Sequence, residues 1–247
     1  LPRLVDKTDL VGVLHAHTTW SDGRQSIEEM ALAARDLGYR YLGITDHSQV
    51  AGYAGGLDPD RLQRQREEIE ALREKELGID ILAGSEVDIL ADGGLDFSDS
   101  VLEGLDFVIA SIHSGFGQSR EVMTDRICSA LSHPRVDILA HPTGRLLLTR
   151  EPYAVDLERV LEVALETGTV LEINANPHRL DLDAVWARRA KEMGISLLLG
   201  PDAHHVGGFA VMRYGLATAR RAWLTAGDVI NSLPLEALRK RLKGGRG

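Results

Sequence analysis

Short apolar runs rich in β-branched residues alternate with longer segments of helical periodicity along almost the whole chain, and no other feature restricts its fold as much. The runs predict strands at residues 11–15, 41–45, 79–85, 107–112, 137–141, 170–174 and 196–200. The apolar spacing between them predicts helices at 26–37, 60–77, 120–131, 156–166, 182–193 and 211–224, with a last short helix at 235–242. This alternation is typical of repeated βα units around a parallel sheet or barrel.

Local start and stop signals support several of these helices. Ser26 and Glu29 have the spacing of a capping box. Gly168 and Gly194 follow helical runs, where a residue in the left-handed conformation commonly ends a helix. The sequence contains no internal repeat and no proline- or serine-rich linker between the elements, so a single α/β domain is predicted. The polar residues 1–9, which begin without Met, are interpreted as the remnant of a linker.

The composition narrows the class of protein. Of the 247 residues, 44% are hydrophobic and 26% are charged, as in a soluble globular protein with a substantial core. The single cysteine, Cys128, excludes a disulfide framework and a cysteine-rich zinc module, and it fits a reducing cytoplasm. No apolar stretch reaches the roughly 20 residues of a membrane span, and the first residues lack the order of a signal peptide. We therefore expect a cytoplasmic monomer that has no contact with membranes.

Almost every predicted strand ends in, or is soon followed by, a side chain that can bind a metal ion. These candidates are His15, His17, Asp22, Asp46, His47, Glu86, His113, His141, Asp202 and His204. The carboxyl ends of all strands in a parallel βα barrel meet on one face, so residues distant in sequence would share one pocket. Such side chains are costly to bury unless they are paired or bound to cations. The pattern therefore predicts a metal site at the C-terminal ends of the strands.

The types and number of donors indicate more than one ion. His15 and His17 are two residues apart at a strand end, so both imidazoles can reach one ion. Glu86 can bridge two ions through its two oxygens. Without Asp46, which either binds an ion or orients a ligand, nine donors remain. Zinc takes about four ligands and manganese about six including waters, so two or three ions are implied.

The net charge of −9 argues against a surface that holds nucleic acid by bulk electrostatics. Three divalent ions beside three carboxylates would leave an excess of positive charge at the site. Such an excess favours nucleophilic displacement at a phosphorus atom. Arg145, four residues after His141, is predicted to neutralise a phosphoryl oxygen, with a structural salt bridge as the alternative. Weaker candidates for substrate contact are Arg120, His178 and Arg179, whereas His133 and His205 are interpreted as ordinary surface or hydrogen-bonded residues.

Six short segments resemble the successive motifs of the PHP (polymerase and histidinol phosphatase) superfamily. They are LHAHTTWSDG, GITDHS, GSEVDI, ASIHSG, LAHPTGR and LGPDAHH, and they span residues 10–205 in the family's order. The strings HTTWSDG, AHPTGRLL and EINANPHRLDLD are most similar to the C-terminal PHP domain of bacterial family X DNA polymerases. The resemblance implies a distorted (β/α)7 TIM-like barrel. It also implies a PHP phosphoesterase domain at 10–247, with 1–9 left from a linker to an upstream polymerase region.

The resemblance further implies a cluster of three divalent ions. By position, His15, His17, Glu86 and Asp202 would bind the first ion, Glu86, His113 and His141 the second, and Asp22, His47 and His204 the third. Glu86, His113, Arg145 and Asp202 are the predicted catalytic residues. Mn²⁺ is the activating ion that the family implies, while the His and carboxylate set also suits zinc or iron.

The activity implied by the resemblance is hydrolysis of phosphoesters at DNA 3′ ends. It comprises a 3′-to-5′ exonuclease, with related 3′-phosphatase, phosphodiesterase and abasic-site endonuclease activities, in base-excision repair. The partners would be single-stranded, gapped or damaged DNA near the nucleoid and the polymerase domains of the parent chain. A phosphatase for a small metabolite such as histidinol phosphate is a second hypothesis. A metal-stabilised DNA-binding or scaffold module is a third, against which the complete ligand set speaks.

Overall fold

The computed structural model describes residues 2–242, and within them the strands form one parallel sheet. Its seven strands are hydrogen-bonded in chain order, as β1 Gly12–Ala16, β2 Tyr41–Ile44, β3 Asp80–Asp88, β4 Phe107–Ser111, β5 Ile138–Leu139, β6 Val170–Asn174 and β7 Leu197–Gly200. A parallel bridge between Ala16 and Ala203 connects the end of β1 to the residues after β7. The sheet is therefore nearly closed, and the predicted distorted (β/α)7 barrel is confirmed.

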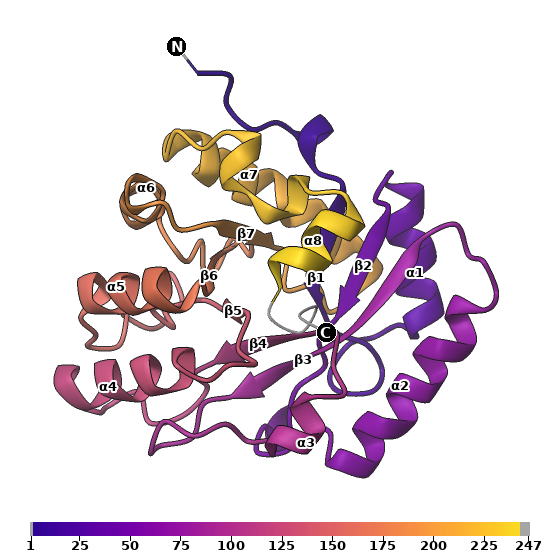
Figure 1. The fold of residues 1–247 in the computed structure, drawn as a ribbon, viewed down its shortest axis with the longest axis horizontal. Helices are drawn as coiled ribbons and strands as arrows, with labels where there is room; N and C mark the ends of the chain where they lie inside the picture. Colours follow the sequence, from indigo (N-terminus) through magenta and orange to yellow (C-terminus); the bar gives the residue numbers. More distant parts are fainter. Residues whose placement is uncertain (1, 243–247) are drawn as a thin grey trace.

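The helices surround the strands, as Figure 1 shows. They are α1 Ile27–Asp36, α2 Pro59–Arg73, α3 Asp99–Leu102, α4 Arg120–Leu131, α5 Leu157–Thr167, α6 Ala184–Met193, α7 Met212–Arg221 and α8 Leu235–Arg241, with 3₁₀ turns at η1 Lys7–Asp9, η2 Gly52–Ala54, η3 Val206–Val211, η4 Ala226–Asp228 and η5 Ile230–Ser232. The capping box of Ser26 and Glu29 is formed, and Gly168 and Gly194 end α5 and α6 in the left-handed conformation. These sequence signals therefore fix where the helices begin and end.

The predicted boundaries were wrong in a few places. The predicted helix 60–77 ends at Arg73, because Glu76 and Gly78 both have positive φ and reverse the chain before β3. β3 continues to Asp88, whose pairing with Ser111 of β4 extends the ladder. The predicted strand 137–141 contains only two ladder residues, Ile138–Leu139. The four-residue α3 was missed because so short a helix shows no periodicity.

The barrel interior is an apolar core that is separate from the layer between strands and helices. It contains Leu14, Tyr41, Leu82, Phe107, Ile109, Ile138, Ala140, Val170, Leu198, Ile230, Leu238 and Leu242. Phe107 takes the space that side chains at two glycines would fill, because a Cβ at Gly43 or Gly84 would lie 2.6 Å from its ring. Ile230 of η5 and Leu238 of α8 belong to the same cluster, so these elements close the end of the barrel opposite the strands' C-terminal ends.

The first described residues pack against the barrel. Val5 is fully buried, and its amide donates to the carbonyl oxygen of Leu224 at 2.9 Å. Asp6 and Asp9 form a capping box around η1. Part of the segment 1–9, which was interpreted as a linker, is therefore integrated into the fold. Residue 1 and residues 243–247 of the predicted domain lie outside the described residues.

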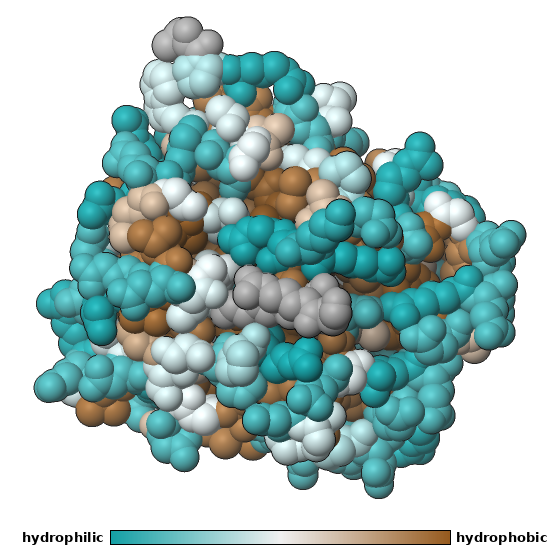
Figure 2. Space-filling model, in the orientation of Figure 1, coloured by the Kyte–Doolittle hydropathy of each residue, from teal (hydrophilic) through white to brown (hydrophobic). Residues whose placement is uncertain are grey.

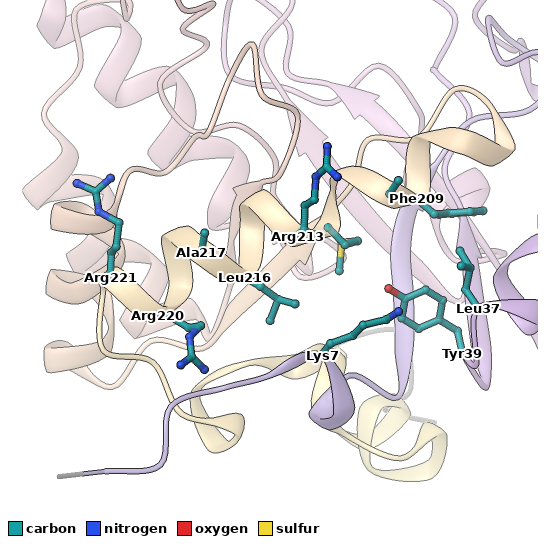
Figure 3. Close-up of a pocket in the computed structure, with 11 residues that line it drawn as sticks. Lys7, Leu37, Tyr39, Phe209, Arg213, Leu216, Ala217, Arg220 and Arg221 are labelled. Carbon is teal, nitrogen blue, oxygen red and sulfur yellow. The ribbon is translucent and has the colours of Figure 1, made fainter.

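The face in Figure 2 is mostly hydrophilic, with hydrophobic side chains mainly between the hydrophilic ones. A cavity of about 710 Å³ lies between η1, the end of α1 and α7. Tyr39, Phe209 and Leu216 supply apolar surface to it, and the cations Lys7 and Arg213 stand among them (Figure 3). None of the predicted metal donors lines this cavity. No helix within residues 2–242 combines the length and apolar character needed to cross a membrane.

Candidate metal centre

The first group of donors is His15, His17 and Asp202, which come from the two ends of the sheet that meet at the barrel closure. The Nε2 atoms of His15 and His17 lie 3.5 and 3.2 Å from Oδ1 of Asp202. Both imidazoles are fully buried. The β1–β2 register shifts between Val13 and Ala16, and His15 has a φ of 74°. This irregularity redirects the chain at the strand end, as β-bulges do beside functional sites.

Glu86, on β3, is the centre of the arrangement. Its Oε1 lies 2.9 Å from Nε2 of His141 and 3.3 Å from Nε2 of His113. Its Oε2 lies 3.4 Å from Nε2 of His15 and 3.2 Å from Nδ1 of His47. Each oxygen therefore faces a different set of imidazoles. This is the geometry that a carboxylate bridging two ions requires.

A third group lies towards solvent and contains Asp22, His204, His17 and His47. Oδ2 of Asp22 is 3.3 Å from Nε2 of His204 and 3.7 Å from Nε2 of His47, and Oδ1 is 3.8 Å from Nδ1 of His17. The rings of His17 and His47 thus have one nitrogen towards this group and the other towards Asp202 or Glu86. All nine predicted donors converge on one mouth of the barrel.

Three clusters of these side chains have donor atoms close enough together to hold an ion. The clusters are His15, His17 and Asp202; His47, Glu86 and His113; and His17, Asp22, His47 and His204, with the donor atoms of each within 4.8 Å of one another. Several imidazole nitrogens are buried without a hydrogen-bond partner among the described residues, namely Nε2 of His15, both nitrogens of His17, Nδ1 of His47 and Nδ1 of His141. Unpartnered buried nitrogens are costly in a folded protein, so this donor set fits divalent cations.

The same donors perturb one another's protonation. Burial would lower the pKa of His113, but the Glu86 and Asp88 carboxylates raise it to about 10. Burial would raise the pKa of Glu86, but the surrounding imidazoles, led by His113 and His47, hold it well below its usual value. Burial is also the main reason that the pKa of His47 falls to about 3. Positive charge is thus required around Glu86, and either protons or metal ions can supply it.

Comparison with known proteins decides the family. The family model described as "PHP domain" matches residues 14–176. The chain belongs to the PHP family. Membership assigns it to the PHP-type metal-dependent phosphoesterases.

Several relatives and solved structures show what this PHP chain is similar to. It is 45% identical to "DNA polymerase/3'-5' exonuclease PolX" of Bacillus subtilis over 98% of its length, but it spans only 42% of that protein. It is 33% identical to a "Probable phosphatase" of Thermoanaerobacter sp. (strain X514), covering 88% of this chain and 89% of the relative. A histidinol phosphate phosphatase of Lactococcus lactis, solved with zinc, L-histidinol and phosphate, shares the fold, with a TM-score of 0.61 and 17% identity over 86% of this chain and 93% of that one.

Two buried carboxylates of the PHP site were missed by the sequence analysis. Glu172 of β6 lies with Oε1 2.6 Å from Nδ1 of His15, while its Oε2 accepts a hydrogen bond of 2.8 Å from the amide of His141. Gly200 leaves it room, because a Cβ there would lie 1.8 Å from Oε1. Asp88 lies 3.3 Å from Nδ1 of His113. Both orient imidazoles towards the centre. The signal for Glu172 was an acidic residue among the apolar residues of β6, whereas Asp88 lies two residues after Glu86 at the end of β3.

Asp46 hydrogen-bonds to residues beside the donors. Its carboxylate is fully buried and accepts hydrogen bonds from the amide and hydroxyl of Thr18, the amide and hydroxyl of Ser21, and the Gln65 amide group at 2.6 Å. Thr18 and Ser21 belong to the loop between His17 and Asp22, whereas Gln65 lies on α2. Asp46 therefore fixes the path of the chain between two donors.

Arg145 makes structural contacts, the alternative to its predicted role at a phosphoryl oxygen. Its Nε donates to the carbonyl oxygen of Arg179 at 2.8 Å, its Nη2 donates to that of Leu180, and its Nη1 lies 3.7 Å from Asp183. These contacts hold the Arg145 guanidinium against the loop that follows β6. Arg179 lies at the site instead, with Nε 3.7 Å from Asp202 and Nη1 buried without a partner in the described part of the chain. Arg145 positions the loop, and Arg179 has the spare donor.

The remaining candidates lie outside the cluster. Arg120 pairs with Asp156 at 2.8 Å. His133 pairs with Asp99 at 3.1 Å, and His205 precedes η3. His178 contacts the loop after β5 through its carbonyl oxygen, which accepts from the amide of Leu147. None of the four contributes a donor to the three clusters.

Proposed function

We propose that this PHP chain hydrolyses phosphodiesters at DNA 3′ ends and removes nucleotides in the 3′-to-5′ direction. The observation that carries the proposal is the 45% identity, over 98% of the chain, to a protein named as a polymerase and 3'-5' exonuclease. The donor set supports it, because eight of the nine predicted donors belong to the three clusters and the ninth, His141, has Nε2 2.9 Å from Oε1 of Glu86. Single-stranded, gapped or damaged 3′ ends in DNA repair are the proposed substrates, and polymerase domains are the proposed partners.

In the proposed reaction His15, His17, Glu86 and Asp202 would hold the first of three divalent ions, Glu86, His113 and His141 the second, and Asp22, His47 and His204 the third. Bound ions of this kind lower the pKa of water and stabilise the charge that develops on a phosphoryl group. Mn²⁺ is the proposed activating ion.

The protein's own groups orient the substrate. The free Nη1 of Arg179 is placed to donate to a phosphoryl oxygen beside Asp202. Glu172 holds His15, and Asp88 holds His113, so their rings keep the orientation that the reaction needs. Water adds to phosphorus and loses a proton, the bond from phosphorus to the 3′ oxygen of the preceding nucleotide breaks, and that oxygen takes up a proton to leave as a hydroxyl group.

A nuclease assay tests the proposal directly. A 5′-labelled single strand and a gapped duplex are incubated with the protein and Mn²⁺, and stepwise shortening is expected. His113→Ala should abolish it, whereas the matched control His133→Ala, which removes an imidazole outside the cluster, should not. The proposal would be overturned if a wild-type sample that hydrolyses other phosphoesters left the DNA intact.

A phosphatase for a small metabolite is the second candidate, favoured by the 33% identity to a protein named "Probable phosphatase" that this chain covers almost completely. Histidinol phosphate is the probe. Rapid release of phosphate from it, without shortening of DNA, would replace the first proposal by this one. A metal-loaded sample that binds DNA but leaves every phosphoester intact would instead support a scaffold role.

A further inference from the structure

Tyr53 is an aromatic side chain that stands exposed beside the metal centre. It lies on η2, in the loop after β2, and 74% of its surface is accessible. Its ring centroid is 6.4 Å from that of His47 and 6.3 Å from that of His113. Its hydroxyl makes no hydrogen bond to any residue in the range 2–242. An exposed ring gains little from burial, so its position next to two donors calls for another explanation.

The loop that carries Tyr53 is held firmly by its backbone. The amides of Ala54 and Gly56 donate to the carbonyl oxygen of Ala51 at 2.9 and 3.1 Å. Nη1 of Arg61 donates to the carbonyl oxygens of Gly55 and Gly56 at 2.8 and 3.0 Å. A Cβ at Gly56 would lie 1.9 Å from the carbonyl oxygen of Ser48, so only glycine permits this close approach. The ring is therefore presented from a fixed support.

Phe116, three residues after His113 in the sequence, is an aromatic residue whose ring faces are covered by other side chains. Its ring is covered by the guanidinium of Arg150 at 4.0 Å and lies almost parallel to Tyr153, with an interplanar angle of 14°. Tyr53 has no guanidinium over its face in the described residues and no aromatic neighbour apart from the two imidazoles. Its face is therefore available to a flat ligand.

We propose that Tyr53 is a stacking platform for a nucleobase of the substrate. The inference rests on the proposed action on DNA and names a residue that selects this substrate class. The Tyr53 ring lies beside His47 and His113, and Arg179 lies beside Asp202 at the same mouth of the barrel, so a phosphate bound at the donors would leave an attached base within reach of the ring. Every base has a flat π face, so the contact does not depend on sequence.

Competitive inhibition tests the inference independently of DNA cleavage. Hydrolysis of p-nitrophenyl phosphate by the wild-type protein with Mn²⁺ is the assay, and thymidine 5′-monophosphate is compared with 2-deoxyribose 5-phosphate as inhibitor. The two inhibitors share sugar and phosphate and differ in the base. The base should lower the inhibition constant by roughly 5- to 100-fold, the range expected for stacking on one aromatic ring. Tyr53→Ala should remove this ratio, whereas Tyr53→Phe should retain it.

The controls separate the inference from the proposed function. Trp223→Ala removes another exposed aromatic ring, 43% accessible and after α7, and should leave the ratio unchanged. A ratio near one in the wild type, or a ratio that survives Tyr53→Ala, overturns the stacking role even if DNA is shortened. A ratio that depends on Tyr53 in a protein that leaves DNA intact supports the base-binding platform and rejects only the nuclease. A raised KM for histidinol phosphate in Tyr53→Ala, with no change for the nucleotide, assigns the ring to an imidazole and also overturns the inference.

Discussion

At one end of the barrel Leu14, Tyr41 and Phe107 fill the interior and α8 covers them, whereas at the other end eight imidazoles and carboxylates gather around Glu86. The same strands supply both ends. Burial at the closed end stabilises the fold by about 25 cal/mol for each Å² of apolar surface removed from water. Burial at the open end removes charged and polar groups from water without giving all of them hydrogen bonds.

The backbone shows the same contrast. Three of the donors, His15, His141 and Asp202, have positive φ angles of 74°, 29° and 52°. Non-glycine residues rarely adopt this region, and each such residue costs of order 1 kcal/mol or more. The interior residues of the closed end named above are absent from this set. The apolar end of the barrel therefore stabilises the fold, and this stability offsets the cost of holding the donors in place at the other end.

Glu86→Gln gives the largest expected effect, because the change keeps the shape of the side chain but removes the charge that faces both sets of imidazoles. Phosphoesterase activity should fall by roughly 10³-fold, as expected when several kcal/mol of charge stabilisation is lost. The helical signal in circular dichroism should persist. A variant with more than a tenth of the wild-type kcat would show that Glu86 does not bridge ions.

Phe107→Ala is the matching change at the closed end. The ring fills the space beside Gly43 and Gly84, so its loss should leave a cavity and lower the free energy of unfolding by about 3–5 kcal/mol. Urea denaturation measures this difference. The fraction that remains folded should keep its kcat, since Phe107 lies at the start of β4 in the apolar interior, whereas the donors lie at the other end of the barrel. A large loss of kcat in folded protein would show that the two ends are coupled.

The fold could be predicted from the sequence because its signals are local and repeated. The period of the apolar residues located the strands, and caps such as Ser26 and Gly168 located helix ends. β5 was predicted too long because its apolar residues continue beyond the two that pair with β4 and β6. The helix α3 could not be predicted, because four residues are too few to show a helical period.

The donors could also be predicted, since the strand ends of a parallel barrel must converge. Their partners could not. Glu172 was hidden within a strand, and only its distance of 2.6 Å from His15 reveals its role. Arg145 and Arg179 could not be ranked from sequence, because which guanidinium faces the site depends on how the loop after β6 folds back. Carbonyl oxygens of that loop accept hydrogen bonds from Arg145, and no sequence pattern predicts these contacts.

Addition of metal ions should stabilise the open end selectively. Ions that bind only the folded state at 100 times their dissociation constant add about 2.7 kcal/mol to the free energy of unfolding. For a chain of this size, Mn²⁺ should then raise the Tm of chelator-treated protein by roughly 5–10 °C. Differential scanning calorimetry measures the shift. His113→Ala should reduce the gain, and Phe107→Ala should keep it. An equal gain in both variants would place the bound ions elsewhere.

Asp181→Asn should have the smallest effect, one confined to a range of pH. Asp181 is fully buried, and burial raises its pKa to about 6 although the amide of Thr143 donates to its Oδ2 at 3.0 Å. The folded-state pKa lies above the ordinary value of 3.8, so the contribution of Asp181 to stability is fully present below about pH 4 and is lost as the pH rises through about 6. Asn keeps an acceptor for Thr143 and does not titrate.

The free energy of unfolding of Asp181→Asn minus that of the wild type should therefore increase between pH 4 and pH 7, by on the order of 2 kcal/mol. Urea denaturation of both metal-free proteins at each pH gives this difference, and groups that titrate equally in both proteins cancel. A difference that stays constant with pH would show that the carboxyl group is hydrated. The penalty of burying charge beside the site would then be confined to the donors themselves.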